Sequence, residues 1–173
     1  MLSWLFSRSP GQRKASDLYG AVVALARTPA LYADMGVADT PEGRYEALVL
    51  NLFLVMERLR AEGEAGVEAS QALIERFVID MDDNMREMGV GDMSVPKKVK
   101  KAAAAFYDRA DVYREAMGQP GDAALAEALE KLVPAAEERT LDAAALAAHL
   151  RAVAEVLGAR GADDVMAGRF QLS

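Results

Sequence analysis

The chain has 173 residues, 52% of them apolar, and it carries a net charge of −7 with no cysteine. This length allows one domain with a substantial core, and this apolar content excludes disorder for the bulk of the chain. The absence of cysteine excludes disulfides, thiolate catalysis and cysteine metal sites, and the negative charge disfavours DNA binding.

Residues 1–14 form a basic and aromatic N-terminal segment that we expect to be flexible. It holds three basic residues and no acid, so the other 159 residues carry −10. Trp4 and Phe6, followed by Arg8, are typical of peripheral contact with an anionic membrane, but we favour a frayed terminus because so short a segment binds lipid weakly. The segment lacks a signal-peptide cleavage site, and no apolar run reaches the roughly 18 residues of a membrane span. We therefore expect a cytoplasmic protein.

Apolar residues recur with helical period over residues 15–173, and clear strand alternation is absent. We therefore expect one all-α domain, a compact bundle of six to seven helices joined by short loops. The predicted helices span residues 15–26, 29–35, 41–60, 68–88, 94–117, 122–133 and 141–157.

The third predicted helix holds the most apolar run of the chain, LVLNLFLVM at residues 48–56. Thr40 followed by Pro41 is typical of a helix start. These nine residues could also form a buried strand, but the pattern continues through Leu59 without a turn residue. A helix is therefore the better prediction.

Turn and capping residues predict the other boundaries. Gly63 and Gly66 indicate a break between two helices, and Gly89 suits a left-handed C-terminal cap. Ser94 and Thr140 are the predicted N-caps of the helices that follow them. The tail beyond residue 158 shows only a weak pattern.

Signals for catalysis are nearly absent. The single histidine, His149, lies in an Ala-rich run, and a lone histidine without a partner to orient its ring is more often structural than catalytic. The chain contains no phosphate loop, HExxH, calcium loop or GxGxxG motif. We therefore expect no enzymatic activity and no cofactor.

An acidic cluster is the best candidate for a metal site. Asp80, Asp83, Asn84 and Glu87 share one face of the predicted helix. A hard cation needs several converging oxygen ligands, and the Glu-x-x-His pairs of di-iron bundles are missing. We expect no metal here, and a carboxylate metal enzyme is the least favoured alternative.

A cluster of lysines lies at the start of the next predicted helix, where positive charge is unfavourable. The positive end of a helix disfavours cations by up to ~1 kcal/mol each. Two sources are open: Asp83 and Glu87 across a helical hairpin that turns at GVGDM, or an anionic partner. The cluster comprises Lys97, Lys98, Lys100 and Lys101.

Methionines are concentrated around the same hairpin. Met81, Met85, Met88 and Met93 lie within 13 residues. Flexible thioethers suit surfaces that accept varied apolar partners, although core filling is the ordinary alternative. The residues alone therefore indicate an all-α protein that binds something.

Three segments in chain order carry a family resemblance: EALVLNLFLVMERLRAEG (46–63), FVIDMDDNMREMGVGDMSVPKKVKKAAAAFYDRADVY (77–113) and DDVMAGRF (163–170). Together they resemble the ubiquinol–cytochrome c chaperone family, the assembly factors of respiratory complex III. The resemblance covers most of residues 16–118 and is strongest within 46–113, above all in 77–113.

The resemblance implies an all-α fold and a non-enzymatic chaperone that binds newly made cytochrome b, before or while haem and partner subunits are added. Mitochondrial members work with a second assembly factor. The implied place is the cytoplasmic face of the inner membrane, as a peripheral protein. The alternative is a membrane-peripheral helical scaffold that recruits other assembly factors.

The resemblance also makes the helical hairpin from Asp80 to Tyr113 the candidate docking surface. The candidate partner-binding residues are Asp80, Met81, Asp83, Asn84, Met85, Arg86, Glu87, Asp92, Lys97, Lys98, Lys101, Phe106, Tyr107, Arg109 and Tyr113. Two positions depart from the family pattern, Asn51 where relatives often carry His and Asp108 where they often carry Gly. The first argues against histidine chemistry on that face, and the second predicts a helical segment around Tyr107.

Overall fold

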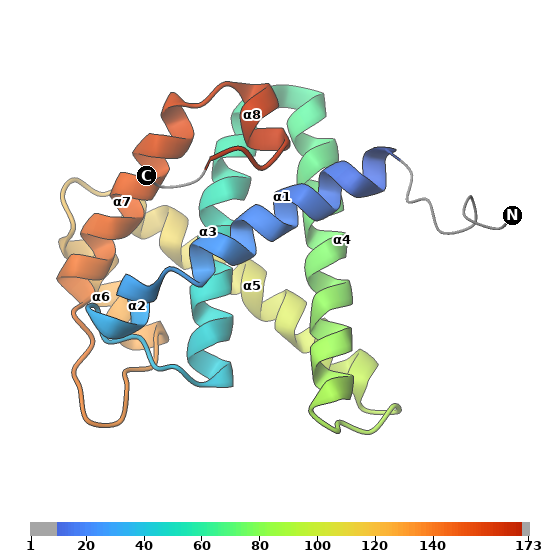
Figure 1. The fold of residues 1–173 in the computed structure, drawn as a ribbon. Coiled ribbons are helices and arrows are strands. Elements are labelled where there is room, and N and C mark those ends of the chain that lie inside the picture. Colours follow the sequence, from blue (N-terminus) through green and yellow to red (C-terminus); the bar gives the residue numbers. More distant parts are fainter. Residues whose placement is uncertain (1–9, 171–173) are drawn as a thin grey trace, which may run out of the picture.

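The structure is a computed structural model that describes residues 10–170, and it is an all-α bundle (Figure 1). Six helices of ten residues or more and two of five residues make up the described part of the chain. Their bounds are α1 Pro10–Ala26, α2 Pro29–Ala33, α3 Pro41–Leu59, α4 Gly63–Glu87, α5 Val95–Met117, α6 Ala123–Leu132, α7 Ala143–Ala159 and α8 Ala162–Met166, with a 3-10 turn at Arg60–Glu62. The predicted fold class is confirmed.

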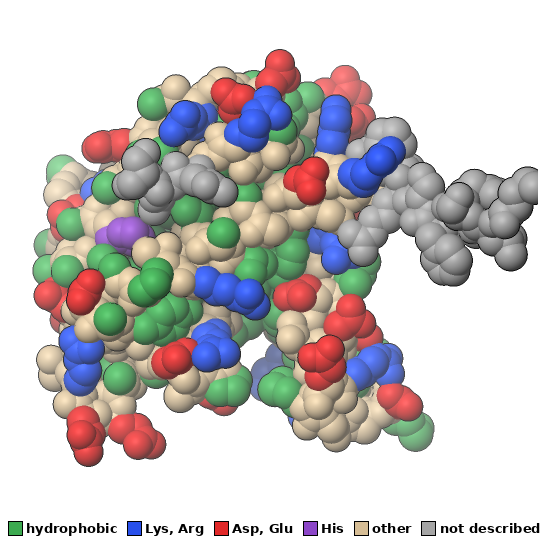
Figure 2. All heavy atoms as spheres, in the orientation of Figure 1, with side chains coloured by type: hydrophobic (Ala, Val, Ile, Leu, Met, Phe, Trp, Pro, Cys, Tyr) green, Lys and Arg blue, Asp and Glu red, His purple; other side chains and the backbone are tan. Residues whose placement is uncertain are grey.

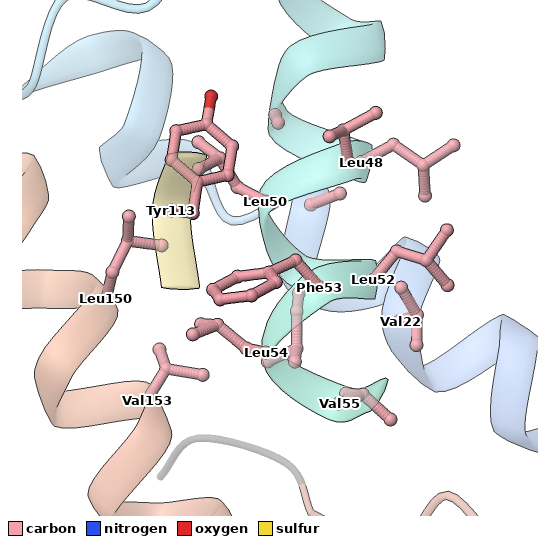
Figure 3. Packing of buried hydrophobic residues seen from close by; sticks show 14 of the residues in the cluster. Val22, Leu48, Leu50, Leu52, Phe53, Leu54, Val55, Tyr113, Leu150 and Val153 are labelled. Atoms are coloured by element: carbon pink, nitrogen blue, oxygen red, sulfur yellow. The ribbon is translucent and has the colours of Figure 1, made fainter. Parts of the chain in front are cut away.

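Helix α3 lies at the centre of the bundle. Every residue from Ala47 to Val55 is buried, which explains why this helix is apolar all round. Helices α1, α4, α5, α7 and α8 all pack against it. In Figure 3, Leu54 points toward Val153 of α7, and Leu52 lies beside Val22 of α1.

Helix α4 begins at Gly63, five residues before the predicted start at residue 68, so the expected break at Gly66 is wrong. Gly66 lies inside the helix, where a Cβ would come within 1.9 Å of the Leu59 carbonyl oxygen. This glycine therefore serves the close approach of α4 to the end of α3. Gly89, with a φ of 79°, has the left-handed conformation that was predicted for it after α4.

The structure confirms one of the predicted helix caps and contradicts another. The Gly43 amide donates to Thr40 Oγ1 over 3.2 Å, as predicted for the start of α3. At α7 the predicted cap Thr140 is wrong, because Asp142 accepts from the Ala145 amide over 2.9 Å. Ser94 occupies the N-cap position of α5, but its side chain makes no capping hydrogen bond.

The two ends of the described chain also differ from prediction. Helix α1 begins at Pro10 instead of Ala15, and residues 1–9, with Trp4, Phe6 and Arg8, lie outside the described residues. Helix α8 was not predicted, since five residues are too few to show a helical period. Among the described residues, no helix has both the length and the hydropathy needed to cross a bilayer.

Candidate functional site

A cleft of about 1550 Å³ opens between the α4–α5 hairpin and the start of α3. Figure 2 shows it as the hollow at the lower edge of the molecule, between α4 and the body that contains α2, α3 and α6. The ends of α1 and α6 complete the walls. The cleft therefore unites segments that lie far apart in the sequence.

The wall from α4 is rich in methionine. Met81, Met85 and Met88 line the cleft at a helical spacing of three and four residues. Phe77 is the last buried residue of α4, so the second half of the helix projects beyond the core. Met81 packs on the core, whereas Met88 is 62% exposed, so core filling explains Met81 but not the whole stripe.

The wall from α5 combines small and basic residues. Lys98, Lys101, Ala102, Ala105 and Arg109 share one stripe of the helix and line the cleft. Lys97 and Lys100, on the same helix, are exposed and are not part of the lining. A hydrogen bond of 2.8 Å from the Tyr45 hydroxyl to the Ala102 carbonyl holds this wall against α3.

The hairpin does not neutralise its lysines. Among the described residues, no ion pair joins any of the four lysines at 97–101 to an acid, so the first of the two open sources, pairing with Asp83 and Glu87, is not present. Arg86 binds the acids near the turn instead, with Nε 2.6 Å from Asp82 and Nη1 2.5 Å from Asp92. The lysine charges are left for a group outside the hairpin.

A buried ion pair closes the floor of the cleft. Arg109 of α5 donates from Nε to Glu46 Oε1 and Oε2 of α3 over 2.6 and 2.7 Å. Glu46 is only 4% exposed. Burial raises the pKa of its carboxyl above the ordinary value, and the hydrogen bonds and charge of Arg109 oppose part of that rise. The pair fixes the angle between α3 and α5.

The predicted partner-binding residues separate into three groups. Those that line the cleft are Asp80, Met81, Asn84, Met85, Lys98, Lys101 and Arg109. Those that are exposed or half-exposed outside the lining are Asp83, Arg86, Glu87, Asp92, Lys97 and Tyr107. Phe106 and Tyr113 are buried in the core, with exposures of 1% and 0%, so they do not offer a surface to a partner.

Sequence reasoning missed the walls that lie outside the hairpin. Arg27, Tyr32, Arg44 and Tyr45 line the cleft from the α1–α3 part of the chain, together with residues 130–134 at the end of α6. No local motif marks them, because the cleft forms only when the segments pack. A bridge between residues 37 and 135 and the hydrogen bond from the residue 38 amide to the residue 134 carbonyl, 2.9 Å, hold these two segments together.

Two residues of the acidic cluster, Asp80 and Asn84, make hydrogen bonds within the protein. Asp80 Oδ2 accepts a hydrogen bond of 2.7 Å from the hydroxyl of Tyr19, and Asn84 Nδ2 donates to the Asp80 carbonyl over 2.8 Å. Burial, followed by the bond to Asp80, raises the pKa of Tyr19. Within residues 10–170, no group of three or more His, Asp or Glu side chains is placed to hold a metal ion.

Three polar residues that the sequence analysis considered, His149, Asn51 and Asp108, are not part of the cleft lining. His149 is half-buried on α7, and burial lowers the pKa of its imidazole. Asn51 is buried in α3, where its Nδ2 donates to the Ala47 carbonyl over 2.8 Å. Asp108 is exposed and lies within α5. The segment around it is therefore helical, as predicted.

The chain is similar to a known protein family and to a solved structure. The family model described as ubiquinol-cytochrome C chaperone matches residues 33–172, which extends farther toward the C-terminus than the resemblance over 16–118. The crystal structure of the Cbp3 homolog from Brucella abortus is similar, with 32% identity and a TM-score of 0.81, and the match covers 100% of this chain and 97% of that chain. No curated protein matches the chain.

Proposed function

The chain belongs to the ubiquinol–cytochrome c chaperone family, and from this premise we propose that it binds newly made cytochrome b and promotes the assembly of respiratory complex III. In this role it holds a client protein and catalyses no reaction. Cytochrome b is a polytopic membrane protein with apolar helices and short charged loops. A binding partner for it needs an apolar surface next to charged groups.

One observation carries the proposal: the methionine and lysine stripes that line the cleft both come from residues 77–113, the segment with the strongest family resemblance. Met85 offers an adaptable apolar contact, and Lys98 offers a cation that has no ion-pair partner among the described residues. The cleft thus joins the two kinds of contact that such a client requires.

Site-specific photocrosslinking in cells tests the proposal. A crosslinker at Met85 or Lys98, inside the cleft, is expected to trap cytochrome b. The same group at Asp83 or Lys97, on the outside of the same helices, is the matched control and is expected to trap little. Normal complex III levels in a strain lacking the protein, or adducts only at the outer positions, would refute the proposal.

We also propose that the protein works as a peripheral protein at the cytoplasmic face of the inner membrane, through Trp4, Phe6 and Arg8. Support comes from the sequence alone, because these residues lie outside the described part of the chain. Flotation with vesicles that contain anionic phosphatidylglycerol is the test. Replacing Trp4 and Phe6 by Ser should abolish flotation, and unchanged flotation would exclude this contact.

A second assembly factor is a further partner that the family suggests. Affinity purification of the tagged protein from membranes, with and without cytochrome b present, would identify it. If a scaffold role were the main function, other assembly factors would be recovered while complex III levels stayed normal in the deletion strain.

A further inference from the structure

We propose that the cleft receives an amphipathic helix of the client, with an acidic side chain bound between Lys98 and Lys101 and an apolar face against Met81, Met85 and Met88. The inference rests on the proposed function, because it names the kind of client segment that the cleft binds.

The walls of the cleft favour a helical occupant. They are built mainly from α1, α3, α4, α5 and α6, and the backbone groups of these helices are already paired within each helix. An extended segment in the cleft would find no open sheet edge and would leave its own amide and carbonyl groups unpaired. A helix satisfies its backbone internally.

The size of the cleft agrees with a helix. Small-molecule sites usually have volumes of about 300–1000 Å³, and this cleft has about 1550 Å³. A helix with a diameter of about 10–12 Å fills that volume with roughly three turns. On α5 the small side chains of Ala102 and Ala105 lie between the lysines and Arg109, so a bound helix can approach this wall closely.

The charges of the lining determine what the occupant carries. Among the described residues, Lys98, Lys101 and Arg27 take part in no ion pair, while Arg109 is neutralised by Glu46. Lys98 also lies at the end of the first turn of α5, near the positive end of the helix, so a carboxylate beside it relieves an unfavourable placement.

The walls from α3 and α6 carry both signs of charge, and the bases there, Arg44 and Lys131, are paired with Asp39 and Glu127. Glu42 of α3 and Glu130 of α6 also line the cleft and have no ion-pair partner in the described residues. A helix with its acid toward α5 and a polar or basic side toward these residues is therefore accepted in one orientation. Charge complementarity sets this orientation, and the methionines supply adaptable apolar contact.

Fluorescence anisotropy with the full chain and three designed 18-residue helical peptides tests the inference. The peptides share a Leu and Ala face and carry Glu, Gln or Lys at two positions one turn apart. We expect the Glu peptide to bind about tenfold more tightly than the Gln peptide, because each lysine adds a few-fold to the affinity. The Lys peptide is expected to bind most weakly.

Two matched double variants locate the effect. Lys98→Gln with Lys101→Gln should abolish the preference for Glu over Gln while the Gln peptide still binds. Lys97→Gln with Lys100→Gln removes the same charge from the same helix outside the cleft and should leave the preference intact. Lys98→Glu with Lys101→Glu should reverse the preference toward the Lys peptide.

A second pair of variants tests the apolar contact between the bound helix and the methionines. Met85→Gln should weaken the binding of all three peptides several-fold. Met93→Gln should leave their affinity unchanged, because Met93 is 98% exposed and lies outside the lining. Unchanged circular dichroism and unfolding midpoints will show that these surface variants fold.

Several results would overturn the inference. An equal loss in both lysine pairs would indicate diffuse attraction, and no binding of any peptide would exclude a helical occupant. Crosslinks to cytochrome b from Met85 together with any of these results would preserve the proposed function and reject only the helix.

Discussion

At the residue scale, the ion pair of Glu46 and Arg109 is the most consequential polar contact of the described residues. It joins α3 to α5 beneath the cleft, and Glu46 is almost fully buried. Removing only Arg109 leaves a buried carboxylate without its partner, which costs far more than the loss of a surface pair. We expect Arg109→Met to lower the free energy of unfolding by roughly 3 kcal/mol, measured by urea denaturation.

Two comparisons make this prediction specific. Arg44→Gln breaks the exposed pair of Arg44 with Asp39 and should lower the free energy of unfolding far less than Arg109→Met, because water screens an exposed pair. Glu46→Leu combined with Arg109→Met should recover most of the stability, because no buried charge is left. Equal losses in the Arg44 and Arg109 variants would contradict the assignment.

The same pair predicts a pH dependence for the Arg109→Met variant. Burial raises the pKa of Glu46 from the ordinary value of 4.5, and without Arg109 nothing in the pair opposes that rise. The folded variant then binds the Glu46 proton more tightly than the unfolded chain, so its stability is lost as the pH rises through the raised pKa. Its deficit relative to wild type should be largest near pH 7 and should shrink below about pH 4.5, which urea unfolding across this range will measure.

Two helical glycines predict opposite effects for the same substitution. At Gly66 an added Cβ would meet the Leu59 carbonyl oxygen at 1.9 Å, whereas at Gly20 no atom of the described residues lies within 4 Å of an added Cβ. Gly66→Ala should therefore destabilise by about 1–3 kcal/mol through forced displacement of the backbone. Gly20→Ala should stabilise by up to about 1 kcal/mol, because alanine is the better helix former. Thermal unfolding of both variants checks the signs, and stabilisation by Gly66→Ala would disprove the close approach.

At the element scale, the start of α7 shows how a plausible cap is displaced by a neighbouring residue. Thr140 has the right chemistry, but residues 140–142 are tied to the α2–α3 connection, where the Asp142 amide donates to the Met35 carbonyl over 2.9 Å. The helix therefore begins at Ala143 with Asp142 as its cap.

The two candidate caps can be distinguished by substitution. Asp142→Ala should lower the free energy of unfolding by about 1 kcal/mol, because the Ala145 amide loses its acceptor. Thr140→Ala should change it by less than about 0.5 kcal/mol. Denaturant midpoints measure both, and a larger loss for Thr140 would mean that α7 begins earlier in solution.

At the scale of the whole molecule, stability is distributed unevenly. Helix α3 is buried on all sides, whereas no residue from 78 to 94 is buried, although this stretch forms the end of the hairpin and one wall of the cleft. Segments with few buried contacts open at lower free energy than the core. The wall that we propose to contact the client can therefore change its conformation at a lower free-energy cost than the core of the described chain.

Native-state hydrogen exchange tests this distribution. The amides of Leu50–Val55 should exchange only through global unfolding, while those of residues 84–94 should exchange through local opening at clearly lower free energy. Protection of the two segments to the same level would show that the hairpin and the core unfold as one unit.

The sequence by itself determined the helices of the described chain other than α8, the all-α class and the family. Helical period and capping residues act over a few neighbours, so the sequence shows which residues share a face of a helix, such as Met81 with Met85 or Lys98 with Lys101. The long ordered motifs of residues 77–113 pointed to the family for the same reason, since they can be read without knowing the packing.

Only the tertiary structure decided which of those faces meet. The angle at which α5 crosses α3 and α4 buries Phe106 and Tyr113, turns Lys98 into the cleft and leaves Lys97 outside it. The cleft also needs the ends of α1 and α6, which no local pattern connects to the hairpin. Packing between segments distant in the chain depends on the fit of whole helix surfaces, and the period of a single helix does not contain that information.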